Sequence, residues 1–97
     1  MTIMFHNQAG RLRALVAAGA AVFYRKHALK EMENDGIVRI DVESMMRACR
    51  VTLVEQSQGE ETWRAEGADF NGRDIAAVVV PYEDDLEIKV ITAWAVK

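Results

Sequence analysis

The chain has 97 residues, of which 51% are hydrophobic and 28% charged, a composition typical of one small globular domain and not of a disordered segment. Twelve Lys and Arg residues stand against 15 Asp and Glu residues, and the net charge of −3 excludes a strongly basic nucleic-acid-binding protein. The single cysteine, Cys49, excludes an intramolecular disulfide framework and fits a reducing compartment.

The charge is unevenly divided along the chain. Residues 1–50 hold eight basic and five acidic side chains, whereas residues 51–97 hold four basic and ten acidic ones. A basic half beside an acidic half is able to bind an anion or to pair head-to-tail with a second copy. The simpler interpretation, which we favour, is that helix faces carry Arg and Lys without a binding role.

The apolar run 14–23 follows Arg11 and Arg13 and so imitates a targeting signal. The run is rich in alanine and far shorter than the roughly 20 residues that cross a membrane. Neither end of the chain carries a lipidation motif. We therefore expect a cytoplasmic protein with no membrane partner.

The first half of the chain has the apolar spacing of three helices. Leu12, Leu15 and Val16 predict a helix over about 8–18, which ends near Gly19. The β-prone residues 22–24 are expected as a brief strand. A second helix is expected to begin at His27 and to end at 34–36.

A third helix follows, for which Ile40 and Asp41 are interpreted as hydrophobic staple and cap. Its apolar residues recur at the helical interval and are expected to face a core; they are Val42, Met45, Met46 and Cys49.

After Arg50 the apolar period changes from 3.6 to 2, which predicts strands over 51–55, 62–66, 75–80 and 86–96. Asn71-Gly72 is a strong hairpin signal, and Pro81 is expected to end the third strand. One face of the last strand is expected to hold Leu86, Ile88, Val90, Thr92, Trp94 and Val96. Helices followed by an antiparallel meander predict an α+β fold.

Both faces of the run 75–80 are apolar, whereas a sheet covered on one side only has polar residues on its other side. We therefore expect the second face to be covered, either by the first helix or by a second copy of the chain in a dimer.

His27 is the strongest candidate for a chemical role, because a helix start disfavours imidazolium and a neutral imidazole is a good general base. Arg25 and Lys26 precede it, and Arg47 lies near the end of the third helix, so these cations are candidate anion ligands. The simpler alternative is that His27 only caps its helix or bonds to the sheet.

Other reactive residue types have simpler structural roles. His6, His27 and Cys49 lack metal-ligand spacing, so neither a metal nor a cofactor is expected. Cys49 is interpreted as a buried small hydrophobe, and Trp63 and Trp94 as core or interface residues.

From about residue 22 to residue 95 the chain resembles the bacterial DUF4258 family, in order and spacing of short motifs. These are His27-Ala28, Met32, Gly36-Ile37, Asp41-Val42, Gly67, Gly72-Arg73, Val78-Val79-Val80 and Ile91-Thr92-Ala93-Trp94. The resemblance extends distantly to toxins of the RelE/ParE type, and implies one domain over 1–97: an extra N-terminal helix (1–20) and a DUF4258-like core (22–95). The implied fold is α+β, with helices before a curled four-stranded antiparallel meander.

The resemblance implies the toxin of a toxin–antitoxin pair, with His27 as a candidate active residue and Arg73 as a second basic position. The first hypothesis is a toxin-like domain that acts on RNA without a metal. In it His27 is the base or acid, and Arg25, Lys26, Arg47 and Arg73 surround the phosphate in one concave site. The alternative is a non-enzymatic protein-interaction or homodimerising module. The expected partner is a second copy or an antitoxin.

Overall fold

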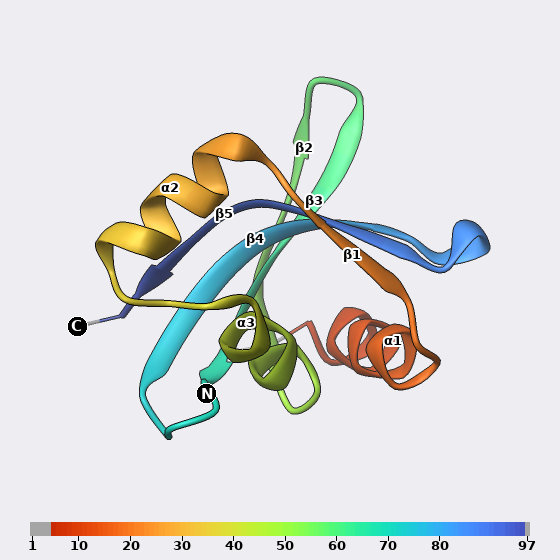
Figure 1. The fold of residues 1–97 in the computed structure, drawn as a ribbon. Helices are drawn as coiled ribbons and strands as arrows, with labels where there is room; N and C mark the ends of the chain where they lie inside the picture. Colours follow the sequence, from red (N-terminus) through yellow and green to blue (C-terminus); the bar gives the residue numbers. More distant parts are fainter. Residues whose placement is uncertain (1–4, 97) are drawn as a thin grey trace.

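The computed structural model describes residues 5–96. Five strands form one open mixed sheet in the order β1-β5-β4-β3-β2, and three helices pack around it (Figure 1). The strands are β1 (Ala21–Tyr24), β2 (Arg50–Ser57), β3 (Glu60–Ala68), β4 (Asp74–Tyr82) and β5 (Glu87–Ala95). The helices are α1 (His6–Ala17), α2 (Lys26–Asn34) and α3 (Arg39–Met46), with a short 3₁₀ turn, η1 (Glu83–Asp85). The predicted α+β class and the three helices are confirmed.

The curled four-stranded antiparallel sheet is wrong, because β1 joins the sheet as a fifth strand parallel to β5 and the sheet is not strongly curled. The register pairs Ala21 with Glu87 and Tyr24 with Val90. β1 has four residues, too few for a periodic pattern that identifies a partner more than sixty positions away. The C-terminal strand β5 therefore lies inside the sheet, between β1 and β4, and not at its edge.

One face of the sheet carries the core. Side chains from all three helices and four strands form a single buried cluster, in which Leu12, Val42, Met45 and Trp63 are almost inaccessible to water. Full burial of each such side chain contributes roughly 1.5–3 kcal/mol. The predicted core roles of Met45, Met46, Cys49 and Trp63 are confirmed.

The predicted apolar face of the last strand is wrong at Leu86, which lies before β5 and is exposed, and it is wrong again beyond Val90. Val79 pairs with Val90, but Val78 pairs with Thr92, so Ile91 is an extra residue that bulges from β5. A one-residue bulge exchanges the two faces of a strand. As a result Ile88, Val90 and Ala93 lie in the core, and Thr92 and Trp94 lie on the other face.

The second face of the sheet is covered by side chains and not by a helix. α1 packs against β2 and α3 on the core face (Figure 1), so the prediction that it covers the second face is wrong. Arg64 of β3 reaches over β4 to Trp94 of β5, with 5.5 Å between the guanidinium carbon and the ring centroid. The small side chain of Ala76 beneath them is fully buried. The predicted dimer stays a prediction.

β4 continues past Pro81 to Tyr82, which corrects the predicted strand end. Pro81 pairs with Ile88 of β5, while the pairing between β3 and β4 ends at Val79. Pro81 therefore lies where β4 has no partner on one side, and the missing N–H interrupts no ladder there.

Gly67 of β3 faces α3 at close range, because a Cβ atom at this position would lie 3.4 Å from Met45 Cγ and 3.5 Å from Cys49 Cα. We expect Gly67→Val to lower the free energy of unfolding by about 1–3 kcal/mol through overpacking. Urea unfolding followed by circular dichroism measures this change. Gly10→Ala, in an open position on α1, is the control and should raise stability by about 0.5–1 kcal/mol. Equal stability of Gly67→Val and the parent would contradict the close approach.

Candidate functional site

Three of the predicted site residues lie together at the start of α2. Arg25 is the extended residue before the helix, and Lys26 and His27 are its first two residues. The His27 side chain is 72% exposed, and its Nε2 lies 3.5 Å from Glu31 Oε2, one turn further along the helix. The imidazole is therefore at the surface and is not buried against the sheet.

Glu31 joins this group to the sheet, because its carboxylate accepts a hydrogen bond from the Thr92 hydroxyl of β5. The carboxylate thus contacts both the imidazole and the hydroxyl. A carboxylate in this position orients an imidazole. Within residues 5–96 His27 forms no other ion pair, and it lines neither the hollow nor the apolar groove described below.

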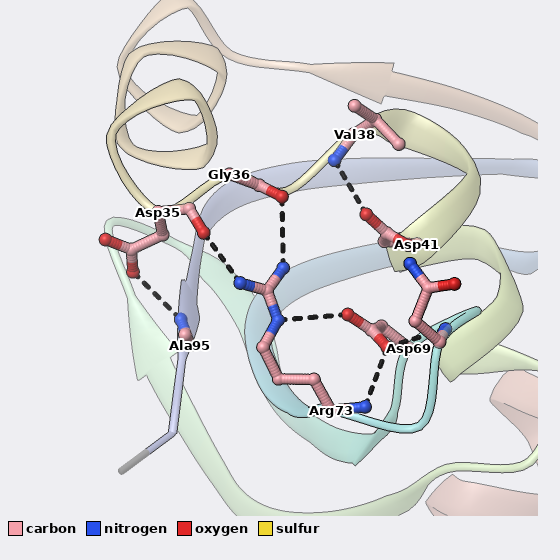
Figure 2. Close-up of polar contacts among 8 residues, drawn as sticks. Asp35, Gly36, Val38, Asp41, Asp69, Arg73 and Ala95 are labelled. Carbon is pink, nitrogen blue, oxygen red and sulfur yellow. Dashed lines mark hydrogen bonds and ion pairs between the residues drawn. The ribbon is translucent and has the colours of Figure 1, made fainter.

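Arg73 lies elsewhere, in the β3–β4 connection, where its guanidinium contacts three groups of this chain (Figure 2). Nε donates to Asp69 Oδ2 at 3.0 Å, Nη1 to the Asp35 carbonyl at 2.8 Å and Nη2 to the Gly36 carbonyl at 3.1 Å. The two carbonyls follow the last residue of α2. We call this arrangement the Arg73 clamp.

The Asp69 carboxylate is 2% exposed and holds the connection in shape. Its Oδ1 accepts hydrogen bonds from the backbone N–H groups of Asn71 and Arg73, each at 2.8 Å. Burial alone would raise the pKa of Asp69, but the two N–H groups and the Arg73 guanidinium outweigh it and hold the pKa below its usual value. Asp69 is therefore a buried, ionised partner of the clamp.

Asp35 adds a further link between α2 and the sheet, since its Oδ2 accepts the Ala95 N–H of β5 at 2.9 Å (Figure 2). His27 and the Arg73 clamp lie at opposite ends of α2, whose nine residues span about 13 Å. The structure therefore does not bring His27 and Arg73 together in one basic site. Their assignment as catalytic residues stays a prediction.

Arg47 follows the last residue of α3 and lines a hollow of about 360 Å³ together with Ile40, Glu43, Ser44 and Phe70. None of Arg25, Lys26 or His27 lines this hollow. The predicted anion ligands are thus divided between two regions of the surface.

A larger apolar groove of about 570 Å³ lies beside this hollow, where α2 connects to α3. Met32 and Ile37 form its buried floor, while Val38 and Ile40 at its border are 57% and 55% exposed. Ile40 borders both the groove and the hollow, and Phe70 at the far end is 65% exposed. We call the groove and the hollow together the α2–α3 surface. Its other members are Leu29, Glu33 and Arg39.

Sequence reasoning missed this surface. Ile40 was expected to pack inward as a staple beside an Asp41 cap, but α3 begins at Arg39 after Val38. Asp41 is the third residue of the helix, and its carboxylate accepts the Val38 N–H at 2.9 Å (Figure 2). The available signal was three apolar residues close together at the start of α3, Ile37, Val38 and Ile40, of which only Ile37 is buried.

Tyr24 of β1 fixes the start of α3. Its hydroxyl donates to Glu43 Oε2 at 3.1 Å and lies 3.3 Å from the Arg39 carbonyl oxygen, and the Arg39 guanidinium carbon lies 4.9 Å from the ring centroid. Burial, and then the Glu43 carboxylate, raise the pKa of the Tyr24 hydroxyl. Two of the four charges on the α2–α3 surface, Arg39 and Glu43, therefore already have partners in this chain.

Three further observations concern residues 5–96. No three His, Cys, Asp or Glu side chains in this part of the chain are placed to hold a metal ion, and none of its helices is long and apolar enough to cross a membrane. Burial raises the pKa of the Cys49 thiol to about 11, so at neutral pH it is not a thiolate nucleophile.

Residues 24–95, most of the chain, match a domain of unknown function, DUF4258. The chain belongs to the DUF4258 family. The match confirms the family that the motifs predicted, and it begins at Tyr24, so α1 lies outside the DUF4258 core. The α2–α3 surface and the Arg73 clamp both lie within this core. No curated protein and no solved structure matches the chain.

The lowered pKa of Asp69 predicts that the contribution of the clamp to the free energy of unfolding depends on pH. The ionised carboxylate stabilises the fold above its unfolded pKa of about 3.9, and this contribution is lost as the pH falls through the lower folded pKa. We expect Asp69→Asn to be less stable than the parent at neutral pH and to lose less stability on acidification. Urea midpoints measured from neutral to acidic pH test this, with Asp84→Asn of the exposed η1 turn as control. Parallel pH curves for Asp69→Asn and the parent would exclude the expected role.

Proposed function

We propose that this DUF4258 chain is a non-enzymatic protein-interaction module, which binds a second polypeptide through the α2–α3 surface. The observation that supports the proposal is the gathering of exposed apolar side chains. Four large apolar side chains in the described residues are more than half exposed, and three of them, Val38, Ile40 and Phe70, border this one surface. Contiguous exposed apolar groups are typical of protein-binding sites.

The chemistry of the groove specifies its occupant. The floor of Met32 and Ile37 accepts a large apolar side chain. Glu33 is exposed at the border and has no ion pair within residues 5–96. The occupant we infer is therefore a polypeptide segment with a large apolar side chain next to a Lys or Arg that meets Glu33.

Selection of random peptides displayed on phage, against the chain immobilised at low density, tests this proposal. We expect the selected peptides to share an aromatic or large aliphatic residue beside a cation. Ile40→Asp should weaken their binding at least about tenfold, because it puts a charge at the centre of the apolar surface. Fluorescence anisotropy with the selected peptides measures the change.

The matched control is Leu53→Asp, because Leu53 is an exposed apolar residue of β2 that lines neither the groove nor the hollow of the α2–α3 surface. It should leave peptide binding unchanged. Peptides that bind the parent and Ile40→Asp equally well, or a selection that yields no binding peptide, would reject the α2–α3 surface as the binding site.

A second candidate is a toxin-like domain that acts on RNA without a metal, with an antitoxin as its partner. What favours it is the exposed His27, oriented by Glu31 and flanked by Arg25 and Lys26. It is weaker than the first proposal for two reasons. All three nitrogens of the Arg73 guanidinium already donate hydrogen bonds within this chain, and Arg47 lies in the Phe70 hollow, apart from His27.

Induced expression in a bacterial host distinguishes the two functions. The interaction-module proposal predicts normal growth with the parent and with His27→Ala, both soluble. Because His27 is exposed, its removal should not unfold the chain. Growth arrest by the parent that His27→Ala relieves would instead support the second candidate, with His27 as its base or acid.

A further inference from the structure

We propose that the second polypeptide is another copy of this chain, in a two-fold dimer in which Phe70 of each protomer enters the groove of the other. This inference rests on the proposed function. It starts from the requirement derived above, a large apolar side chain beside a cation. Phe70 and Arg47 of this chain line the same hollow and meet that requirement.

The shape of the α2–α3 surface is complementary to itself. Ile40 borders both the apolar groove and the hollow of Phe70, so it lies between the concave end and the end that carries the exposed ring. A two-fold axis that passes near Ile40 exchanges these two ends. Each Phe70 is then opposite the other copy's groove, as an isologous interface requires.

The charged side chains at the two ends of the α2–α3 surface are complementary about the same two-fold axis. Arg39 and Glu43 are engaged by Tyr24, which leaves Glu33 at the groove end and Arg47 at the Phe70 end. Both are exposed, and within residues 5–96 neither forms an ion pair. Exchange of the two ends brings each Arg47 to the other copy's Glu33, which gives two symmetric ion pairs around an apolar centre.

The Arg73 clamp holds the Phe70 end in place before any contact is made. Phe70 follows the buried Asp69, whose carboxylate accepts the N–H groups of Asn71 and Arg73 (Figure 2). The Arg73 guanidinium then joins this connection to the residues after α2, at the edge of the groove. Because the ring and the groove are fixed to one another, little conformational freedom is lost on binding.

Sedimentation velocity over at least about a hundredfold range of concentration tests the dimer, using the full chain. We expect a reversible monomer–dimer equilibrium with a dissociation constant of about 1–100 µM, as is typical of a small interface. Phe70→Ala should raise this constant at least about tenfold, as an exposed aromatic anchor does when it is truncated. Leu53→Ala is the matched control and should not change it.

Reversing the charges at Arg47 and Glu33 tests whether these two side chains pair across the dimer interface. Arg47→Glu and Glu33→Lys should each weaken the dimer, because each puts like charges opposite one another. The double variant in one chain should restore most of the lost affinity, because both ion pairs are re-formed in reverse. Urea midpoints for all variants, all at exposed positions, show that the fold is retained.

A chain that stays monomeric while selected peptides still bind it would overturn the dimer and leave the proposed function standing. A dimer that Phe70→Ala and the charge reversals do not affect would also overturn it, because the two copies would then meet through another surface. If the parent chain binds no selected peptide and does not self-associate, the proposed function itself is rejected.

Discussion

The Arg73 guanidinium joins two segments that are distant in the sequence, the β3–β4 connection and the residues that follow α2. Its planar group is matched to this task, because it donates in three directions at once to one carboxylate and two carbonyl groups. It also supplies positive charge where the helix dipole of α2 is negative. Together with the hydrogen bonds from Thr92 to Glu31 and from the Ala95 N–H to Asp35, this side chain fixes the position of α2 relative to the sheet, and hence the groove between α2 and α3.

The parts of the fold that local patterns determine were predictable. The apolar stripes of α1 and α3, the alternation of β2 and β3 and the continuous apolar run of β4 identify those elements, because each pattern is long enough to be recognised. The parallel pairing of β1 with β5 was not predictable, because four residues and a distant partner give no local signal. Nor was the bulge at Ile91, since a run apolar on both faces hides the exchange of its faces.

The candidate site divides in the same way. Arg25, Lys26 and His27 lie together because they are consecutive, so sequence reasoning placed them correctly without any knowledge of the fold. Arg73 donates to backbone carbonyl groups, which every residue has, so the sequence gives no signal that identifies its partners. The exposure of Val38 and Ile40 depends on the angle at which α3 leaves α2, which is set by the Arg73 clamp and by Tyr24 rather than by the side chains themselves.

The two faces of the sheet are covered in chemically different ways. The core face is closed by apolar helices, whereas the other face is closed by long side chains that cross β4, Arg64 to Trp94 and Lys89 to Glu60. Added salt screens the ion pairs on one face, while salts excluded from protein surfaces strengthen apolar burial on the other. A salt that is excluded from protein surfaces therefore strengthens apolar burial on one face of the sheet while it weakens the ion pairs on the other.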